Sequence, residues 1–296
     1  MMSLAKVSTR LKGIHQLSGR GNCYLFEKEG LLLDTGAPGD LEGLEILPHV
    51  ENVLLTHSHE CHAGGLIKVC SAYSPRVFCS ELAVEMLKNR HGIPEERIEP
   101  LKGNETLSFG KLRFRVIPCP GHTKDSMAFY ETKRGLLFTG DSVFVGEERR
   151  IPQGADLGEW AESVRFLSTL KVSFLLPGHG EVQRGKNVPK MIVESYAFLQ
   201  GKAEGDPLMG LIAGGIQYAD LDMMPEALEM FDAVLAKEPE NPGAAFSKGL
   251  TLLKMSRFKE AVDCFDLALR VVPDFKEAAN AKALALAAVK GVNPER

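Results

Sequence analysis

The stretch that decides the fold covers residues 56–65 and reads Thr-His-Ser-His-Glu-Cys-His-Ala-Gly-Gly. It places three imidazoles and one thiol within six residues, namely His57, His59, Cys61 and His62. Neither helical spacing nor strand alternation puts all three histidines on one face. The apolar run at 52–55 is typical of a buried strand, and the two glycines at the end permit a turn. Because histidine is the commonest metal ligand among side chains, we expect these imidazoles to converge on a metal at a strand end.

The same arrangement recurs along the chain: an apolar run ends, a turn follows, and a histidine or aspartate is presented there. The residues presented in this way are Asp34, His122, Asp141 and His179, after apolar runs at 31–33, 107–117, 136–139 and 174–176. Functional side chains commonly lie where strands end in loops. His15, His49 and His91 lie outside such turns and are interpreted as surface or core histidines.

The runs between these turns predict a layered arrangement of strands and helices. Strands are expected at 11–17, 23–26, 31–33, 77–79 and 127–130, with a hairpin at 107–117 that turns at Gly110. Helices are expected at 40–47, 81–90, 156–170 and 187–200. The helix at 187–200 would close a first domain, and the polar segment at 202–207 would follow it as a linker.

Together the motifs resemble the metallo-β-lactamase superfamily, whose signature is similar to Thr-His-x-His-x-Asp-His, then Gly-His, Gly-Asp and Gly-His. The resemblance covers roughly residues 8–200 and implies an α+β fold, the αββα sandwich, with metals held at one edge. It implies a first metal bound by His57, His59 and His122. It implies a second metal bound by residue 61, His62 and His179, with Asp141 bridging the two. Asp34 is expected to orient one of the histidines.

One position departs from the family pattern, because Cys61 stands where the family has aspartate. Zinc accepts thiolate as readily as carboxylate, and sulfur favours zinc over harder cations. We therefore expect two Zn²⁺ sites. In the alternative interpretation Cys61 is a small buried apolar residue and the second site is weak or empty.

The resemblance implies a hydrolase in which a metal-bound hydroxide attacks a small-molecule ester, thioester, lactone or amide. Two alternatives stay open. One is a mononuclear iron enzyme similar to the sulfur dioxygenases, and the other is a non-catalytic metal-binding scaffold for protein interaction. Arg149 and Arg150 lie in a loop after Asp141, either at the edge of the pocket or on the solvated surface.

The last part of the chain contains a repeat with a period of 34 residues. The paired positions are Gly215 and Gly249, Ala227 and Ala261, Phe231 and Phe265, and Pro239 and Pro273. This pattern resembles the tetratricopeptide repeat over about residues 208–290. The usual aromatic near the start of each repeat is replaced by Leu211 and Ala245. We expect a metallo-β-lactamase-like domain at 1–204 and an all-α, repeat-like domain at 205–296. The second domain either binds a protein or peptide, or serves as a small homodimerisation or packing module.

Composition and charge limit the binding partners and the cellular location that we expect. The net charge of -4, without a basic run, argues against nucleic acid as a partner. No stretch approaches the 18 apolar residues of a membrane span, and residues 1–6 lack the apolar core of a signal peptide. The six cysteines form no CxxC pair, so we expect a cytoplasmic protein without a disulfide framework.

Overall fold

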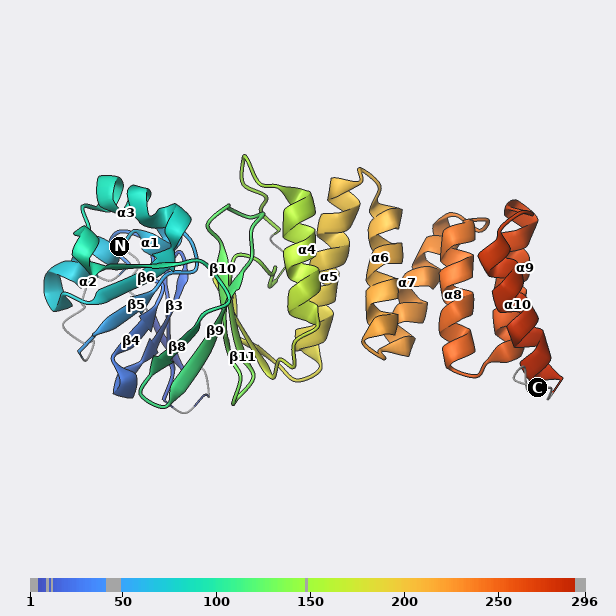
Figure 1. Cartoon of the computed structure of the whole chain (residues 1–296), viewed down its shortest axis with the longest axis horizontal. Coiled ribbons are helices and arrows are strands. Elements are labelled where there is room, and N and C mark those ends of the chain that lie inside the picture. Colours follow the sequence, from blue (N-terminus) through green and yellow to red (C-terminus); the bar gives the residue numbers. More distant parts are fainter. Residues whose placement is uncertain (1–4, 9–10, 12, 41–48, 147–148, 291–296) are drawn as a thin grey trace. The chain divides into compact units, whose positions relative to one another are not determined.

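The computed structural model describes residues 5–8, 11, 13–40, 49–146 and 149–290. The chain forms two compact units, 1–192 and 193–296, which are coloured from blue to yellow and from yellow to red in Figure 1. The helix expected at 40–47 lies outside the described residues, apart from Asp40 in a turn. In the described part of the chain, no helix is long and apolar enough to cross a bilayer.

The first unit is built on two sheets. The first has the strand order β1 (Ala5–Ser8), β2 (His15–Ser18), β3 (Asn22–Phe26), β4 (Leu31–Leu33), β5 (Asn52–Leu54), β6 (Arg76–Ser80) and β7 (Ile98–Leu101). The second has the order β13 (Gln183–Arg184), β12 (Phe174–Pro177), β11 (Leu136–Gly140), β10 (Met127–Glu131), β9 (Leu112–Pro118) and β8 (Thr106–Phe109). The predicted hairpin at 107–117 is the β8–β9 pair, and Gly110 has a positive φ of 56° in its turn.

The apolar core lies between the facing sheets. Alternate side chains of a strand point to opposite faces, so in β4 Leu31 and Leu33 enter this core while Leu32 packs on the other side of the sheet. Aromatic rings connect the sheets, because Phe26 of β3 meets Phe114 of β9 with the ring centroids 5.7 Å apart.

Helices cover the outer faces of both sheets. On the first sheet these are α1 (Glu60–Ala63), α2 (Leu66–Tyr73) and α3 (Val84–His91), which pack on the face that includes Leu32. On the second sheet, α4 (Leu157–Ser168) lies beside β9, where the Arg115 guanidinium stacks over the Phe166 ring at 5.6 Å. The predicted αββα sandwich is confirmed.

Strand direction determines where the functional residues meet. Strands β4, β5 and β6 run parallel, as do β11 and β12, so each set ends at one edge of its sheet. Asp34 follows β4, the Thr56–His59 loop follows β5, Asp141 follows β11, and Gly178–His179 follow β12. His62 lies one turn further on, in α1.

The second unit contains the helices α6 (Pro207–Asp220), α7 (Met224–Lys237), α8 (Pro242–Lys254), α9 (Phe258–Val271) and α10 (Lys276–Val289). A helical domain after the sandwich is therefore confirmed. The helices α7 and α9 recur at the period expected from the sequence. Packing repeats as well, because an added Cβ would lie 2.6 Å from the Phe231 ring at Gly215 and 2.5 Å from the Phe265 ring at Gly249. Likeness to the tetratricopeptide repeat remains a resemblance.

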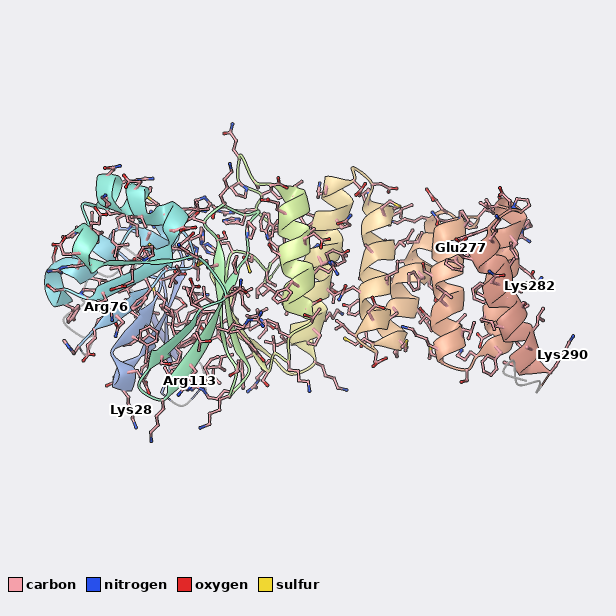
Figure 2. The ribbon with its side chains drawn as sticks, in the orientation of Figure 1. Lys28, Arg76, Arg113, Glu277, Lys282 and Lys290 are labelled. Atoms are coloured by element: carbon pink, nitrogen blue, oxygen red, sulfur yellow. The ribbon has the colours of Figure 1, made fainter. Side chains whose placement is uncertain are left out.

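Ion pairs follow the same period. Lys248 binds Asp232 at 2.5 Å, and Lys282, labelled in Figure 2, pairs with Asp266 in the next repeat. The long helix α5 (Asn187–Ala203) contains the division between the units, which falls after Ile192. Residues 204–206 connect α5 to α6. A domain boundary at 204 thus remains a prediction, and the end of α5 groups with the helical unit.

Candidate metal centre

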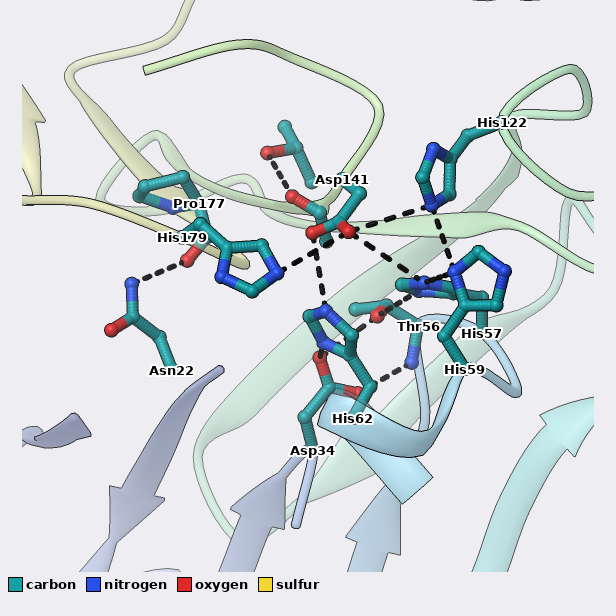
Figure 3. A network of polar contacts seen from close by, with 12 residues as sticks. Asn22, Asp34, Thr56, His57, His59, His62, His122, Asp141, Pro177 and His179 are labelled. Carbon is teal, nitrogen blue, oxygen red and sulfur yellow. Dashed lines mark hydrogen bonds and ion pairs between the residues drawn. The ribbon is translucent and has the colours of Figure 1, made fainter. Parts of the chain in front are cut away.

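The first donor group consists of side chains from three separate turns. Nδ1 of His59 lies 3.1 Å from Nε2 of His57 and 3.0 Å from Nε2 of His122. A carboxylate oxygen, Oδ2 of Asp141, lies 3.4 Å from Nε2 of His122 and 3.9 Å from Nε2 of His57. These four residues present their donor atoms to one point (Figure 3).

The second donor group shares Asp141 with the first. Its members are Cys61, His62, Asp141 and His179, and all their donor atoms lie within 4.8 Å of one another. Oδ1 of Asp141 is 3.1 Å from Nε2 of His62, and Oδ2 is 3.4 Å from Nε2 of His179. Every residue predicted to bind a metal therefore lies in one of two adjoining groups.

Asp34 contacts His62 of the second group directly and His57 of the first group through Thr56. It adopts a left-handed conformation with φ of 55° at the end of β4 and is 3% exposed. One carboxylate oxygen accepts from the Thr56 amide at 2.8 Å, and the other accepts from the Thr56 hydroxyl and contacts Nδ1 of His62, both at 2.8 Å. The Thr56 hydroxyl in turn meets Nδ1 of His57 at 3.1 Å. Asp34 thus contacts one histidine directly and another through Thr56. Its role in orienting metal ligands stays a prediction.

Burial lowers the pKa of two histidines in the first group. It lowers the pKa of His122 to about 4, and burial together with neighbouring imidazoles holds the pKa of His57 well below its usual range. These rings are neutral at pH 7, as metal binding requires.

In the second group, hydrogen bonds and neighbouring carboxylates change the histidine pKa values more than burial does. Burial lowers the pKa of His62, but Asp141 and Asp34 raise it well above its usual value. Hydrogen bonds to Asp141 and Cys61 raise the pKa of His179 to about 9. Burial raises the pKa of the Cys61 thiol, but contacts with His179 and His62 bring it down to about 7.

The donor atoms are arranged to bind a metal ion more favourably than to hydrogen-bond with one another. Nε2 of His62 and Oδ1 of Asp141 are buried 3.1 Å apart, close enough for an ion pair but without good hydrogen-bond geometry. Poorly satisfied buried polar atoms are costly, and a cation bound by both atoms would satisfy them with the ring neutral. A donor set of imidazoles, a carboxylate and a thiol suits zinc.

Sequence reasoning missed several residues that shape the centre. The side-chain amide of Asn22 and the hydroxyl of Tyr24 donate hydrogen bonds to the Pro177 carbonyl at 3.0 and 2.7 Å. These bonds fix the turn before His179. At Gly178 an added Cβ would lie 2.3 Å from Oδ1 of Asp141, so only glycine fits. The glycine before His179 was visible in the sequence, but nothing local to Asn22 or Tyr24 indicates a partner more than 150 residues away.

Other predicted residues lie apart from these two groups. Arg149 and Arg150 are both exposed, next to residues outside the described part of the chain. His15 and His49 contact Glu27 and Glu51 at 3.1 and 3.4 Å, and His91 is buried at the end of α3. None of these three histidines belongs to either donor group.

Comparison with known proteins identifies the family. The model of the metallo-beta-lactamase superfamily matches residues 18–179, which include every residue of the two donor groups. The chain belongs to the metallo-β-lactamase superfamily.

Similar proteins come from fungi and archaea. A lactamase-like protein, nscB, of Arthroderma benhamiae is 30% identical over 190 residues, 61% of this chain and 40% of that protein. A thioesterase, pkgB, of Emericella nidulans is 29% identical over 178 residues, 57% of this chain and 48% of that protein. The chain thus spans less than half the length of these relatives. An archaeal superfamily structure from Sulfolobus tokodaii has the same fold, with a TM-score of 0.53 and 21% identity over 62% of this chain and 84% of its own.

Proposed function

We propose that the chain is a metal-dependent hydrolase that binds two zinc ions. The observation that carries this proposal is the pair of donor groups joined through Asp141. His57, His59 and His122 would hold the first ion, Cys61, His62 and His179 the second, and Asp141 would contact both. When bound there, a metal pair supplies a hydroxide nucleophile near pH 7 and positive charge for the developing oxyanion.

The chain's own residues keep the donors in place before a metal arrives. Asp34 holds the Nδ1 side of His62, which leaves Nε2 directed at Asp141. Thr56 does the same for His57. Such contacts fix ring orientation and raise ligand basicity. Asn22 and Tyr24 fix the carbonyl before Gly178, so the turn that carries His179 keeps its position.

We propose a thioester or another activated ester as the substrate class, with lactones and amides as less favoured relatives of the same carbonyl chemistry. The name of the Emericella thioesterase supports this choice. The test is a panel of acyl thioesters, aryl esters, lactones and amides, assayed with protein of known metal content. Hydrolysis of thioesters or esters that stops on chelation and returns with zinc is expected. A panel without any metal-dependent turnover would contradict the proposal.

One observation supports two metals over the single-iron alternative. The four donors of the second group lie together and include a thiol. Iron enzymes of that type use histidine and carboxylate ligands, whereas sulfur favours zinc. A non-catalytic scaffold would share this geometry, and the substrate panel separates it from the hydrolase.

We also propose that the helical unit binds protein, either a peptide or a second copy of the chain. Three exposed apolar side chains recur at the repeat period on α6, α8 and α10: Ile216, Leu250 and Leu284, which are 44, 40 and 51% exposed. Contiguous exposed apolar patches mark interaction surfaces, and the recurrence of these residues at the repeat period supports such a surface here. A dimer that Leu250→Ser disperses in sedimentation would identify a second copy. A monomer that selects peptides from a displayed library, and loses them in Leu250→Ser, would identify a peptide. Neither behaviour would contradict the proposal.

A further inference from the structure

A single buried side chain contacts two of the three turns that supply the first donor group. Trp160 of α4 is the only tryptophan of the chain and is fully buried. Its indole N–H donates to the Ser142 carbonyl at 2.8 Å, directly after Asp141. Its ring meets the His122 ring edge-on, with centroids 4.9 Å apart and an interplanar angle of 71°. Trp160 therefore connects a histidine donor to the turn that carries the shared carboxylate.

His122 lacks the polar contact that orients two other donor histidines. Nδ1 of His57 meets the Thr56 hydroxyl, and Nδ1 of His62 meets Asp34. Nδ1 of His122 is buried and has no hydrogen-bond partner among the described residues. Metal-binding histidines usually have such a partner, which fixes the ring. In His122 the ring orientation must come from packing, and the indole of Trp160 provides that contact.

The helix that carries Trp160 is anchored to the loop of His122. The Gly121 carbonyl accepts from the Asp156 amide at 2.9 Å, and the Pro120 carbonyl accepts from the Ser163 hydroxyl at 2.9 Å. Gly121 has φ of 126°, and an added Cβ would lie 2.3 Å from the backbone of Trp160. Helix and loop therefore keep a fixed relation, and the indole cannot shift without disturbing His122.

We infer that Trp160 is a positioning residue for the first donor group, acting through His122 and the turn of Asp141. This inference rests on the metal centre proposed above. Since Trp160 touches no donor of the second group except through Asp141, its loss should weaken the first group most. Phenylalanine would keep a ring against His122 but lose the bond to Ser142, whereas leucine would lose both.

The test measures Co²⁺ affinity by visible absorption in a His179→Ala background, which weakens the second group and leaves the first to be titrated. Supporting residues around metal ligands typically contribute 10–100-fold to affinity. We expect Trp160→Phe to weaken Co²⁺ binding by about 10-fold and Trp160→Leu by about 100-fold. Unchanged affinity in Trp160→Leu would overturn the inference. If the leucine variant does not fold, the phenylalanine variant decides by the same criterion.

A control separates positioning from general support by the helix. Leu167 is a fully buried residue of the same helix, about two turns beyond Trp160. Leu167→Ala should lower the melting temperature and leave Co²⁺ affinity unchanged. An equal loss of affinity in Leu167→Ala would overturn the inference.

Fluorescence tests the contact without changing the tryptophan. Co²⁺ quenches indole emission at short range, and all indole emission comes from Trp160. Binding of Co²⁺ should quench it in the His179→Ala protein and not in the variant that also carries His122→Ala. Bound Co²⁺ without quenching would overturn the inference and leave the metal centre intact. Failure of the unaltered chain to bind Co²⁺ would overturn the metal centre itself.

Discussion

At the scale of single residues, the centre depends on buried donor atoms that lie close together without good hydrogen-bond geometry. Nε2 of His62 and Oδ1 of Asp141 are the clearest pair. The motifs predicted which residues meet, because turns after parallel strands collect at one sheet edge. They could not predict that Trp160 lies against His122, because an apolar residue in a helix pattern carries no sign of its partner. The assignment of metal ligands remains a prediction, which the following two variants test.

Removing a donor of the first group should remove its metal. His57→Ala should lower zinc affinity by more than the roughly 10–100-fold typical of supporting residues, because a ligand itself is lost. Activity on any substrate found should disappear with it. The matched control is His49→Ala, since His49 is exposed and contacts only Glu51 among the described ion pairs. Metal content by elemental analysis checks the pair, and a His57→Ala protein with normal zinc would refute the assignment.

The thiol of Cys61 should bind the second metal. The Cys61→Ser protein should lose that ion and keep the first. The control is Cys70→Ser, which changes a half-buried thiol of α2 and should leave both ions bound. X-ray absorption of the zinc-loaded protein should show a sulfur neighbour near 2.3 Å. Zinc bound by His62 and His179 without sulfur in its first coordination sphere would leave Cys61 as a packing residue.

At the scale of elements, periodicity predicted most helices and strands well. The repeat is the best case, because α7 and α9 begin at Met224 and Phe258, one period apart. The long helix α5 was harder to interpret. Its apolar pattern predicts a helix but not the unit on which each turn packs. In the structure Val193 joins the core of the helical unit, so α5 belongs to both units.

The close approach of helices in the repeat predicts opposite effects for two glycines of α8. Gly249→Ala should destabilise the helical unit by about 1–3 kcal/mol, because its Cβ would collide with the fully buried Phe265 ring. Gly243→Ala should stabilise it by about 0.4–1 kcal/mol, since the nearest atom to its Cβ lies at an ordinary 3.5 Å. Urea unfolding measures both, and equal effects would contradict the packing described.

At the scale of the whole molecule, all proposed donors precede the helical unit, and His179 is the last of them. The proposed metal centre therefore lies wholly in the first unit, and the proposed binding surface lies in the second. The sequence indicated this division through the change from glycine turns to a helical repeat. It could not place the division within α5, because that depends on which residues α5 contacts.

A shortened chain of residues 1–204 should keep its metal content. It should be less soluble than the full chain, because residues of α5 that pack on α6 become exposed; Ala197, for example, lies against Gly210 and Gly214. Metal analysis and light scattering of the shortened chain check this expectation. Complete unfolding with no recoverable metal would show that the two units form one cooperative structure.

The most direct test of the account is a crystal structure of the zinc-loaded chain with anomalous diffraction recorded at the zinc edge. Two anomalous peaks are expected for each chain, one among His57, His59 and His122 and one among Cys61, His62 and His179. Both zinc ions should contact Asp141, at separations of about 3.5–4 Å from each other, as in two-metal hydrolases. A single peak, or zinc bound away from Asp141, would contradict the proposed two-metal centre.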